Sequence, residues 1–283
     1  MSVPLPWAVM RARNGEQRRS LLLALAACIG TVVLVATCAT ASRADDLNEA
    51  QVGKEIFGEL KSQGEIVKSS PLYNTLAPIA AAITKAVQPQ YPYPIHFYIV
   101  HESQPNAFAA PGGNVYVIDS LLYFVKNTEE LAGTLCHETS HLLHHDSMEL
   151  MKRNEAIRKR AVGAAILLGP TLETVLTVGA IARLDSKHYS REVEEAADLK
   201  GSDTCAAAGY NPWGLVWLFE DFSNEDMKSP PEMLSDHPNN AHRIAQLKAH
   251  FAQSLGTFAK FDANPKSATP LRLRADEAET FLR

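Results

Sequence analysis

The sequence is poor in cysteine, with four among 283 residues. Cys28 and Cys38 lie in an apolar N-terminal stretch, so Cys136 and Cys205 alone remain for the rest of the chain. Two cysteines exclude a fold held by a framework of disulfides, and neither has a second cysteine at the spacing of a metal-ligand pair. An oxidising compartment would allow Cys136 and Cys205 to pair, but buried free thiols are the commoner case, and we expect those.

The sequence also lacks a basic cluster beyond its N-terminus, and its formal net charge is -5. Proteins that bind nucleic acid group lysine and arginine to neutralise phosphates. We therefore expect no nucleic-acid partner. There is no internal repeat, and 46% hydrophobic with 21% charged residues is ordinary for a globular protein with a sizeable core.

An uncharged stretch, "LLLALAACIGTVVLVATCATA" at residues 21–41, follows a pair of arginines. This order is typical of a secretory signal, and the small residues Ser42 and Ala44 predict cleavage after Ala44. The stretch is also long enough, at about 20 apolar residues, to remain as a membrane anchor, and "LAAC" around Cys28 resembles a lipidation site. All three alternatives predict export to the periplasm or cell envelope, and an uncleaved segment would add membrane association.

The remaining pattern predicts an α+β fold. Apolar residues at helical spacing predict helices over about 45–63, 70–87, 127–154, 190–209, 211–224 and 240–255. The stretches 93–103 and 114–119 alternate with β-branched and aromatic residues, which predicts two strands of a small antiparallel sheet. Residues 161–184 read as two buried helical pieces divided by Pro170. We expect a signal or anchor over 1–44, one domain over 45–259 and a loosely ordered tail over 260–283.

The stretch "HETSH" indicates a metal site. His137 and His141 are four residues apart on the predicted helix 127–154, so both imidazoles can reach one ion. Glu138 is placed to reach a water beside that ion without binding the metal. This is the H-E-x-x-H pattern of zinc peptidases. His144 and His145 lie up to a turn further on, and we expect neither to bind the metal.

A catalytic zinc site needs a third protein ligand. In "SREVEEAAD", Glu194 and Asp198 are four residues apart on one helix face, which suits a ligand and a nearby proton-handling carboxylate. Glu195 is three residues from Asp198, so helical geometry alone leaves either glutamate open as the ligand. We expect Glu192 and Glu195 to be solvated.

Four ordered motifs carry a resemblance to a known family: "NAFAAPGGNVYV", "EELAGTLCHETSH", "SREVEEAAD" and "HPNNAHR". Between about Leu47 and Leu255 the chain resembles the gluzincin metallopeptidases. These include the CAAX prenyl endopeptidases, the HtpX membrane proteases and the periplasmic BepA- and LoiP-type proteases. The resemblance implies a mostly helical zincin-type domain, one Zn²⁺ per chain and a sheet whose edge strand borders the active-site cleft.

The resemblance also implies roles for individual residues. His137, His141 and Glu194 would bind zinc, Glu138 would act as general base, and Asp198 would be the acidic partner that donates a proton. Substrate-binding or regulatory roles fall on Asn106, Ala107, Gly112, Gly113, His237 and Arg243. The last two are expected over the cleft, although Arg243 could instead simply pair with a carboxylate.

One departure from the family pattern concerns Asp146, which stands where the family often has a histidine, nine residues after the first ligand. Since the family position is not a ligand, we expect little effect from the change.

The function expected from these features is that of a zinc endopeptidase acting on extended or misfolded cell-envelope proteins. Its partners would be unfolded or misassembled substrates, which the strand at 111–119 would accept as a sheet edge. Two alternatives are a chaperone-like binding module with suppressed proteolysis and a zinc-storage protein. An intact Glu138 argues against both.

Overall fold

The computed structural model describes residues 48–156, 189–224, 240–271 and 273. Contacts divide the chain into Met1–Asp46 and Leu47–Arg283. The expected signal and the apolar stretch 161–184 lie outside the described residues, so those predictions stay predictions. Within the described part, no helix combines the length and the apolar character needed to cross a membrane.

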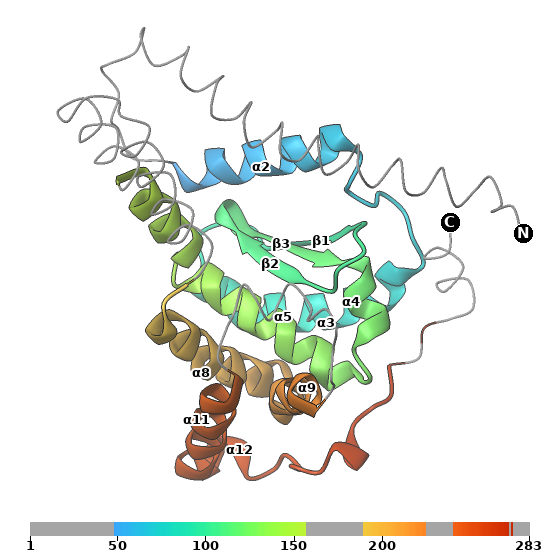
Figure 1. The fold of residues 1–283 in the computed structure, drawn as a ribbon, viewed down its shortest axis with the longest axis vertical. Helices are drawn as coiled ribbons and strands as arrows, with labels where there is room; N and C mark the ends of the chain where they lie inside the picture. Colours follow the sequence, from blue (N-terminus) through green and yellow to red (C-terminus); the bar gives the residue numbers. More distant parts are fainter. Residues whose placement is uncertain (1–47, 157–188, 225–239, 272, 274–283) are drawn as a thin grey trace, which may run out of the picture. The chain divides into compact units, whose positions relative to one another are not determined.

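Three strands form a mixed sheet in the order β1-β3-β2 (Figure 1). β3 (Asn114–Ile118) lies in the middle, parallel to β1 (His96–Val100) and antiparallel to β2 (Ala107–Ala110). The α+β class is confirmed, but the sheet is not wholly antiparallel. In the sequence β2 lies between the two predicted strands, and β3 pairs with β1 in parallel. The four residues of β2, "AFAA", include three alanines, which carry little strand propensity. The expectation that 111–119 supplies the edge is therefore wrong, since β2 is the edge strand beside the helix that carries His137.

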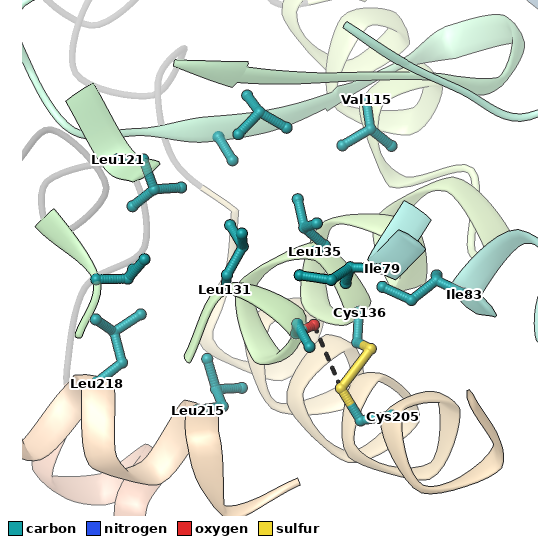
Figure 2. Packing of buried hydrophobic residues seen from close by; sticks show 14 of the residues in the cluster. Ile79, Ile83, Val115, Leu121, Leu131, Leu135, Cys136, Cys205, Leu215 and Leu218 are labelled. Carbon is teal, nitrogen blue, oxygen red and sulfur yellow. Dashed lines mark hydrogen bonds between the residues drawn. A yellow bond between two sulfur atoms is a disulfide. The ribbon is translucent and has the colours of Figure 1, made fainter. Parts of the chain in front are cut away.

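Helices cover both faces of the sheet (Figure 1). α2 (Glu49–Gln63) lies over one face, while α3 (Leu72–Val87) and α5 (Thr128–Leu143) lie over the other. Because strand residues alternate in direction, Val115 and Val117 pack toward α5 and Tyr116 toward α2. Figure 2 shows Val115 above Leu131 and Leu135 of α5. Every residue of β3 is buried, which fixes the register of the sheet.

A second helical layer lies on the far side of α5. It consists of α8 (Arg191–Ala208), α9 (Trp213–Asn224), α11 (Asn240–Gln253) and α12 (Leu255–Phe258). The shorter elements are η1 (Gln88–Gln90) after α3, η2 (Pro111–Gly113) between β2 and β3 and against α2, α4 (Asp119–Phe124) after β3, and η3 (Pro265–Ser267) beside α9. Two sequence signals mark helix ends as expected. Asn127 caps α5 by accepting the N–H of Glu130, and Gly209 ends α8 with a φ of 88°.

The predicted helix 127–154 is interrupted at His145. This residue has a φ of 57°, in the left-handed region, and the chain then continues as a helix from residue 146 to 156. Histidine is among the residues that enter this region most readily without being glycine. The break turns Asp146 and Ser147 back toward the sheet and the end of α5.

α5 and α8 cross at very short range, and a disulfide joins them at the crossing. A Cβ on Gly201 of α8 would lie 3.0 Å from the Cα of His137. Cys136 and Cys205 are bonded, with their Cα atoms 5.8 Å apart (Figure 2). The expectation of free thiols is therefore wrong. The sequence separation of 69 between the two cysteines concealed the helix crossing that brings them within bonding range.

The chain after residue 260 runs along the beginning of α5. The Thr128 N–H donates to Thr269 O (2.8 Å), the Leu271 N–H donates to Lys126 O (3.1 Å), and Trp217 Nε1 donates to Ala263 O (2.9 Å). The described part of the expected loose tail, up to residue 271, is thus attached to the start of α5. Such backbone hydrogen bonds leave no periodic pattern in the sequence. The sequence therefore predicted a loosely ordered tail.

We predict that Gly201→Ala lowers the free energy of unfolding by about 1–3 kcal/mol, because the new methyl group must push α8 away from the backbone of His137. Urea denaturation of the two proteins measures the difference. Gly58→Ala is the matched control. A Cβ there meets nothing within 4 Å in the middle of α2, so this substitution should raise stability by about 0.5–1 kcal/mol. Equal effects of the two substitutions would contradict the tight crossing.

Candidate metal centre

Three buried side chains converge between α5 and α8. His137, His141 and Glu194 each offer a ligand atom, and these atoms all lie within 4.8 Å of one another. The Nε2 atoms of the two histidines are 3.1 Å apart. Two nitrogens bound at about 2.0–2.1 Å to a tetrahedral zinc ion are roughly 3.3 Å apart, so the pair suits this ion. Two imidazoles and one carboxylate also form the donor set of a catalytic zinc site.

A carboxylate lies against the second nitrogen of each histidine. Asp198 Oδ1 is 3.0 Å from Nδ1 of His137, and Asp146 Oδ2 is 2.8 Å from Nδ1 of His141. Such contacts place the proton on Nδ1, leave Nε2 for the metal and hold the ring in position. The expectation that Asp146 matters little missed this contact, which depends on the helix break at His145.

Arg243 of α11 forms ion pairs with both acidic residues of α8, Glu194 and Asp198. Its Nε and Nη2 donate to the two oxygens of Asp198 at 2.7 and 2.6 Å, and its Nη1 lies 3.1 Å from Glu194 Oε2. Although burial opposes ionisation, the guanidinium lowers the pKa of Asp198. A fully buried, ionised Asp198 suits orientation of His137 better than the proton donation that the resemblance implies. Arg243 is itself only 2% exposed and pairs with two buried carboxylates, the alternative role expected for it.

The electrostatic balance of the cluster favours a cation. Burial alone would lower the pKa of His137, yet hydrogen bonds to Asp198 and Glu194 raise it to about 9. Burial, and next the charge of Glu194, raise the pKa of Asp146 to about 6. The shift of His137 indicates that its carboxylate partners stabilise added positive charge here, as a divalent metal ion would supply.

Glu138 lies between the ligand cluster and the sheet. Its side chain is buried, and its Oε2 accepts the N–H of Ala109 on β2 at 3.0 Å. Glu138 directly follows His137 in the chain, but its carboxylate points to the edge strand β2. The peptide bond of a substrate would lie there.

The residues of the first motif are partly structural. Asn106 is buried, and its Oδ1 accepts the N–H of Ala107 at 2.9 Å. Gly112 and Gly113 form the turn between β2 and β3 with φ values of 78° and 92°. A Cβ on Gly113 would lie 2.1 Å from Pro94 O, so the turn itself requires glycine.

Two other histidines of α5 and the break after it, His144 and His145, do not join the ligand cluster that the described residues form. The side chain of His144 is 36% exposed, and Nδ1 of His145 contacts Glu49 Oε2 at 2.7 Å. His237 lies outside the described residues, and its expected place over the cleft stays a prediction.

Tyr189 belongs to the site but was missed in the sequence. Its ring stacks on the imidazole of His141, with centroids 4.3 Å apart and planes inclined by 17°. Its hydroxyl is 3.0 Å from that of Ser147. Tyr189 immediately precedes the third motif, but no spacing rule places an aromatic ring against a ligand of another helix.

A family model described as peptidase family M48 matches residues 74–250. The chain belongs to this family. The match lies within the region of resemblance expected from the four motifs, and it contains all three candidate ligands. The expected membership of a zinc metallopeptidase family is therefore confirmed.

Several proteases are similar to this chain. The beta-barrel assembly-enhancing protease of Yersinia pestis is 29% identical over 174 residues, covering 56% of this chain and 36% of the relative. The metalloprotease YcaL of Escherichia coli K12 is 27% identical over 232 residues, covering 79% of this chain and 89% of the relative. The mitochondrial metalloendopeptidase OMA1 of Schizosaccharomyces pombe is 28% identical over 156 residues, covering 53% of this chain and 45% of the relative. The chain thus spans about a third of the length of the Yersinia protein.

We predict that Asp146→Ala weakens zinc binding by about 10- to 100-fold, because His141 loses the carboxylate that orients its ring. Competition with a chromophoric chelator measures the dissociation constant. Glu149→Ala is the matched control, since it removes a carboxylate three residues further along the chain. Among the described residues, Glu149 forms an ion pair only with Lys152, at the surface. Wild-type affinity in Asp146→Ala would show that the contact is incidental.

We also predict that Glu194→Ala abolishes tight zinc binding, whereas Glu192→Ala retains one zinc per chain. Glu194 is 2% exposed and faces both histidines, while Glu192 lies on the exposed side of the same first turn. Zinc per purified chain, measured by atomic emission, distinguishes the two variants. A zinc-replete Glu194→Ala protein would place the third ligand elsewhere.

Proposed function

We propose that this chain is a zinc-dependent endopeptidase that cleaves extended or misfolded proteins of the cell envelope. The observation that carries the proposal is the position of Glu138. Glu138 directly follows the candidate ligand His137 on α5, and its carboxylate accepts the N–H of Ala109 on an edge strand. A peptide added to this edge would present its backbone to the carboxylate and to the ligand cluster together.

Each residue of the site has a definite part in such a reaction. Zinc bound by His137, His141 and Glu194 would lower the pKa of a water molecule and polarise the scissile carbonyl. Glu138 accepts the proton of the attacking water on its carboxylate and passes it to the leaving nitrogen. Asp198 keeps the ring of His137 in place throughout.

The proposed substrate class follows from the edge strand. Main-chain pairing with β2 requires an extended segment, which a folded protein rarely offers, and it places little demand on side-chain identity. The names of the relatives agree with this class, since one is called a beta-barrel assembly-enhancing protease. We therefore infer that the substrates are unfolded or misassembled envelope proteins, met in the periplasm or at a membrane surface.

The chaperone-like alternative explains less of the site. Burying Glu138 beside Glu194 and Asp198 has an electrostatic cost that a binding module has no reason to bear. A zinc-storage protein would likewise need neither Glu138 nor its contact with β2.

We predict that Glu138→Gln retains zinc and the fold but lowers the rate of cleavage by at least about 100-fold, because an amide keeps the shape and cannot accept the proton. Cleavage of an unfolded casein by the zinc-loaded protein is the assay. Glu55→Gln, at the exposed surface of α2, is the control and should remain active. If the wild-type protein binds casein and leaves it intact, the chaperone-like alternative holds instead.

A further inference from the structure

The outer edge of β2 can be identified from the pairing of the sheet. The Ile118 N–H donates to Asn106 O at 2.9 Å, and the register then pairs Phe108 with Tyr116. In an antiparallel ladder, alternate residues bond to the neighbouring strand. Asn106 and Phe108 are thus the residues whose main-chain groups face β3. The main-chain groups of the alternate residues, Ala107 and Ala109, therefore point away from β3.

Side chains cap three of these outward groups. Asn106 Oδ1 accepts the N–H of Ala107 (2.9 Å), and Glu138 Oε2 accepts the N–H of Ala109 (3.0 Å). The hydroxyl of Ser147 donates to Ala109 O at 2.8 Å. Both backbone groups of Ala109, the residue beside the general base, are thus bonded before any substrate arrives.

Ser147 is linked to the ligand cluster as well as to β2. The break at His145 starts a new helix, which brings the Ser147 hydroxyl to 3.0 Å from the hydroxyl of Tyr189. The Tyr189 hydroxyl can donate to Ser147 while Ser147 donates to Ala109 O. Tyr189 in turn stacks on His141.

We propose that the carbonyl of Ala109 is a substrate-pairing position and that Ser147 is its displaceable cap, which sets how readily an extended peptide enters the site. The proposal rests on the proposed peptidase function. A backbone N–H of the substrate replaces the Ser147 hydroxyl at Ala109 O. The displaced hydroxyl retains Tyr189 as a hydrogen-bond partner, so the exchange leaves no buried polar group without a bond.

The test compares three variants of the zinc-loaded full chain on an unfolded peptide substrate. Ser147→Ala removes the competitor for Ala109 O and should lower KM by roughly two- to ten-fold with kcat unchanged, the change expected for one neutral hydrogen bond. Ser147→Thr keeps a hydroxyl and should restore the wild-type KM. Ser223→Ala is the matched control, because Ser223 makes a similar bond to Phe219 O within α9.

Tyr189→Phe is a fourth variant, for which the expected change in KM has the opposite sign to that of Ser147→Ala. It keeps the ring on His141 but removes the partner that receives the displaced Ser147, so KM should rise by a few-fold. Anisotropy of a labelled unfolded peptide on the zinc-free proteins should show dissociation constants that change in the same two directions.

The outcomes separate this proposal from the peptidase function. An unchanged or raised KM in Ser147→Ala overturns the role of Ser147 as a displaceable cap. A loss of kcat alone in Ser147→Ala or in Tyr189→Phe overturns it as well. A wild-type chain that cleaves no peptide overturns the proposed function, whereas cleavage with equal peptide affinity in all variants overturns the cap alone.

Discussion

The guanidinium of Arg243 is the positive charge on which the interior of this protein depends. Glu194 and Asp198 are both buried, and two carboxylates without a cation at this depth would cost several kcal/mol each. Arg243 bonds to both and lies 4.4 Å from the ring of Phe219 in α9. Docking of α11 is therefore an electrostatic requirement of the metal centre. A chain without α11 would hold the same ligands and lack the charge that keeps them together.

The second requirement is a fixed distance between α5 and α8, since each carries part of the ligand set. The absent side chain of Gly201 permits the contact, and the disulfide at Cys136, directly before the first ligand, ties the helices at the same level. The C-terminal segment adds hydrogen bonds at the start of α5. The ligands are thus held by helices whose separation is fixed at several points, which is the usual condition for a preformed metal site.

Local spacing made much of this arrangement predictable. The pairs His137 with His141 and Glu194 with Asp198 each lie on one helix, and four-residue spacing places them on one face. What could not be predicted are contacts between elements. The hydrogen bond of Asp146 depends on a left-handed residue at position 145, and the disulfide depends on a crossing of helices far apart in the sequence. β2 was not predicted, because its alanines are as typical of a loop or a helix as of a strand.

The capped edge of β2 has a further consequence for the protein's own solubility. An exposed strand edge is a template on which unfolded chains stack into cross-β aggregates. A protease of the proposed function would meet such chains at high local concentration, next to this edge. Side chains that already bond to Ala107 and Ala109 make the edge a poor nucleus for such growth, while a single peptide can still pair there by exchange. The same caps that govern entry to the site would thus keep the enzyme from being trapped in the deposits of its substrates.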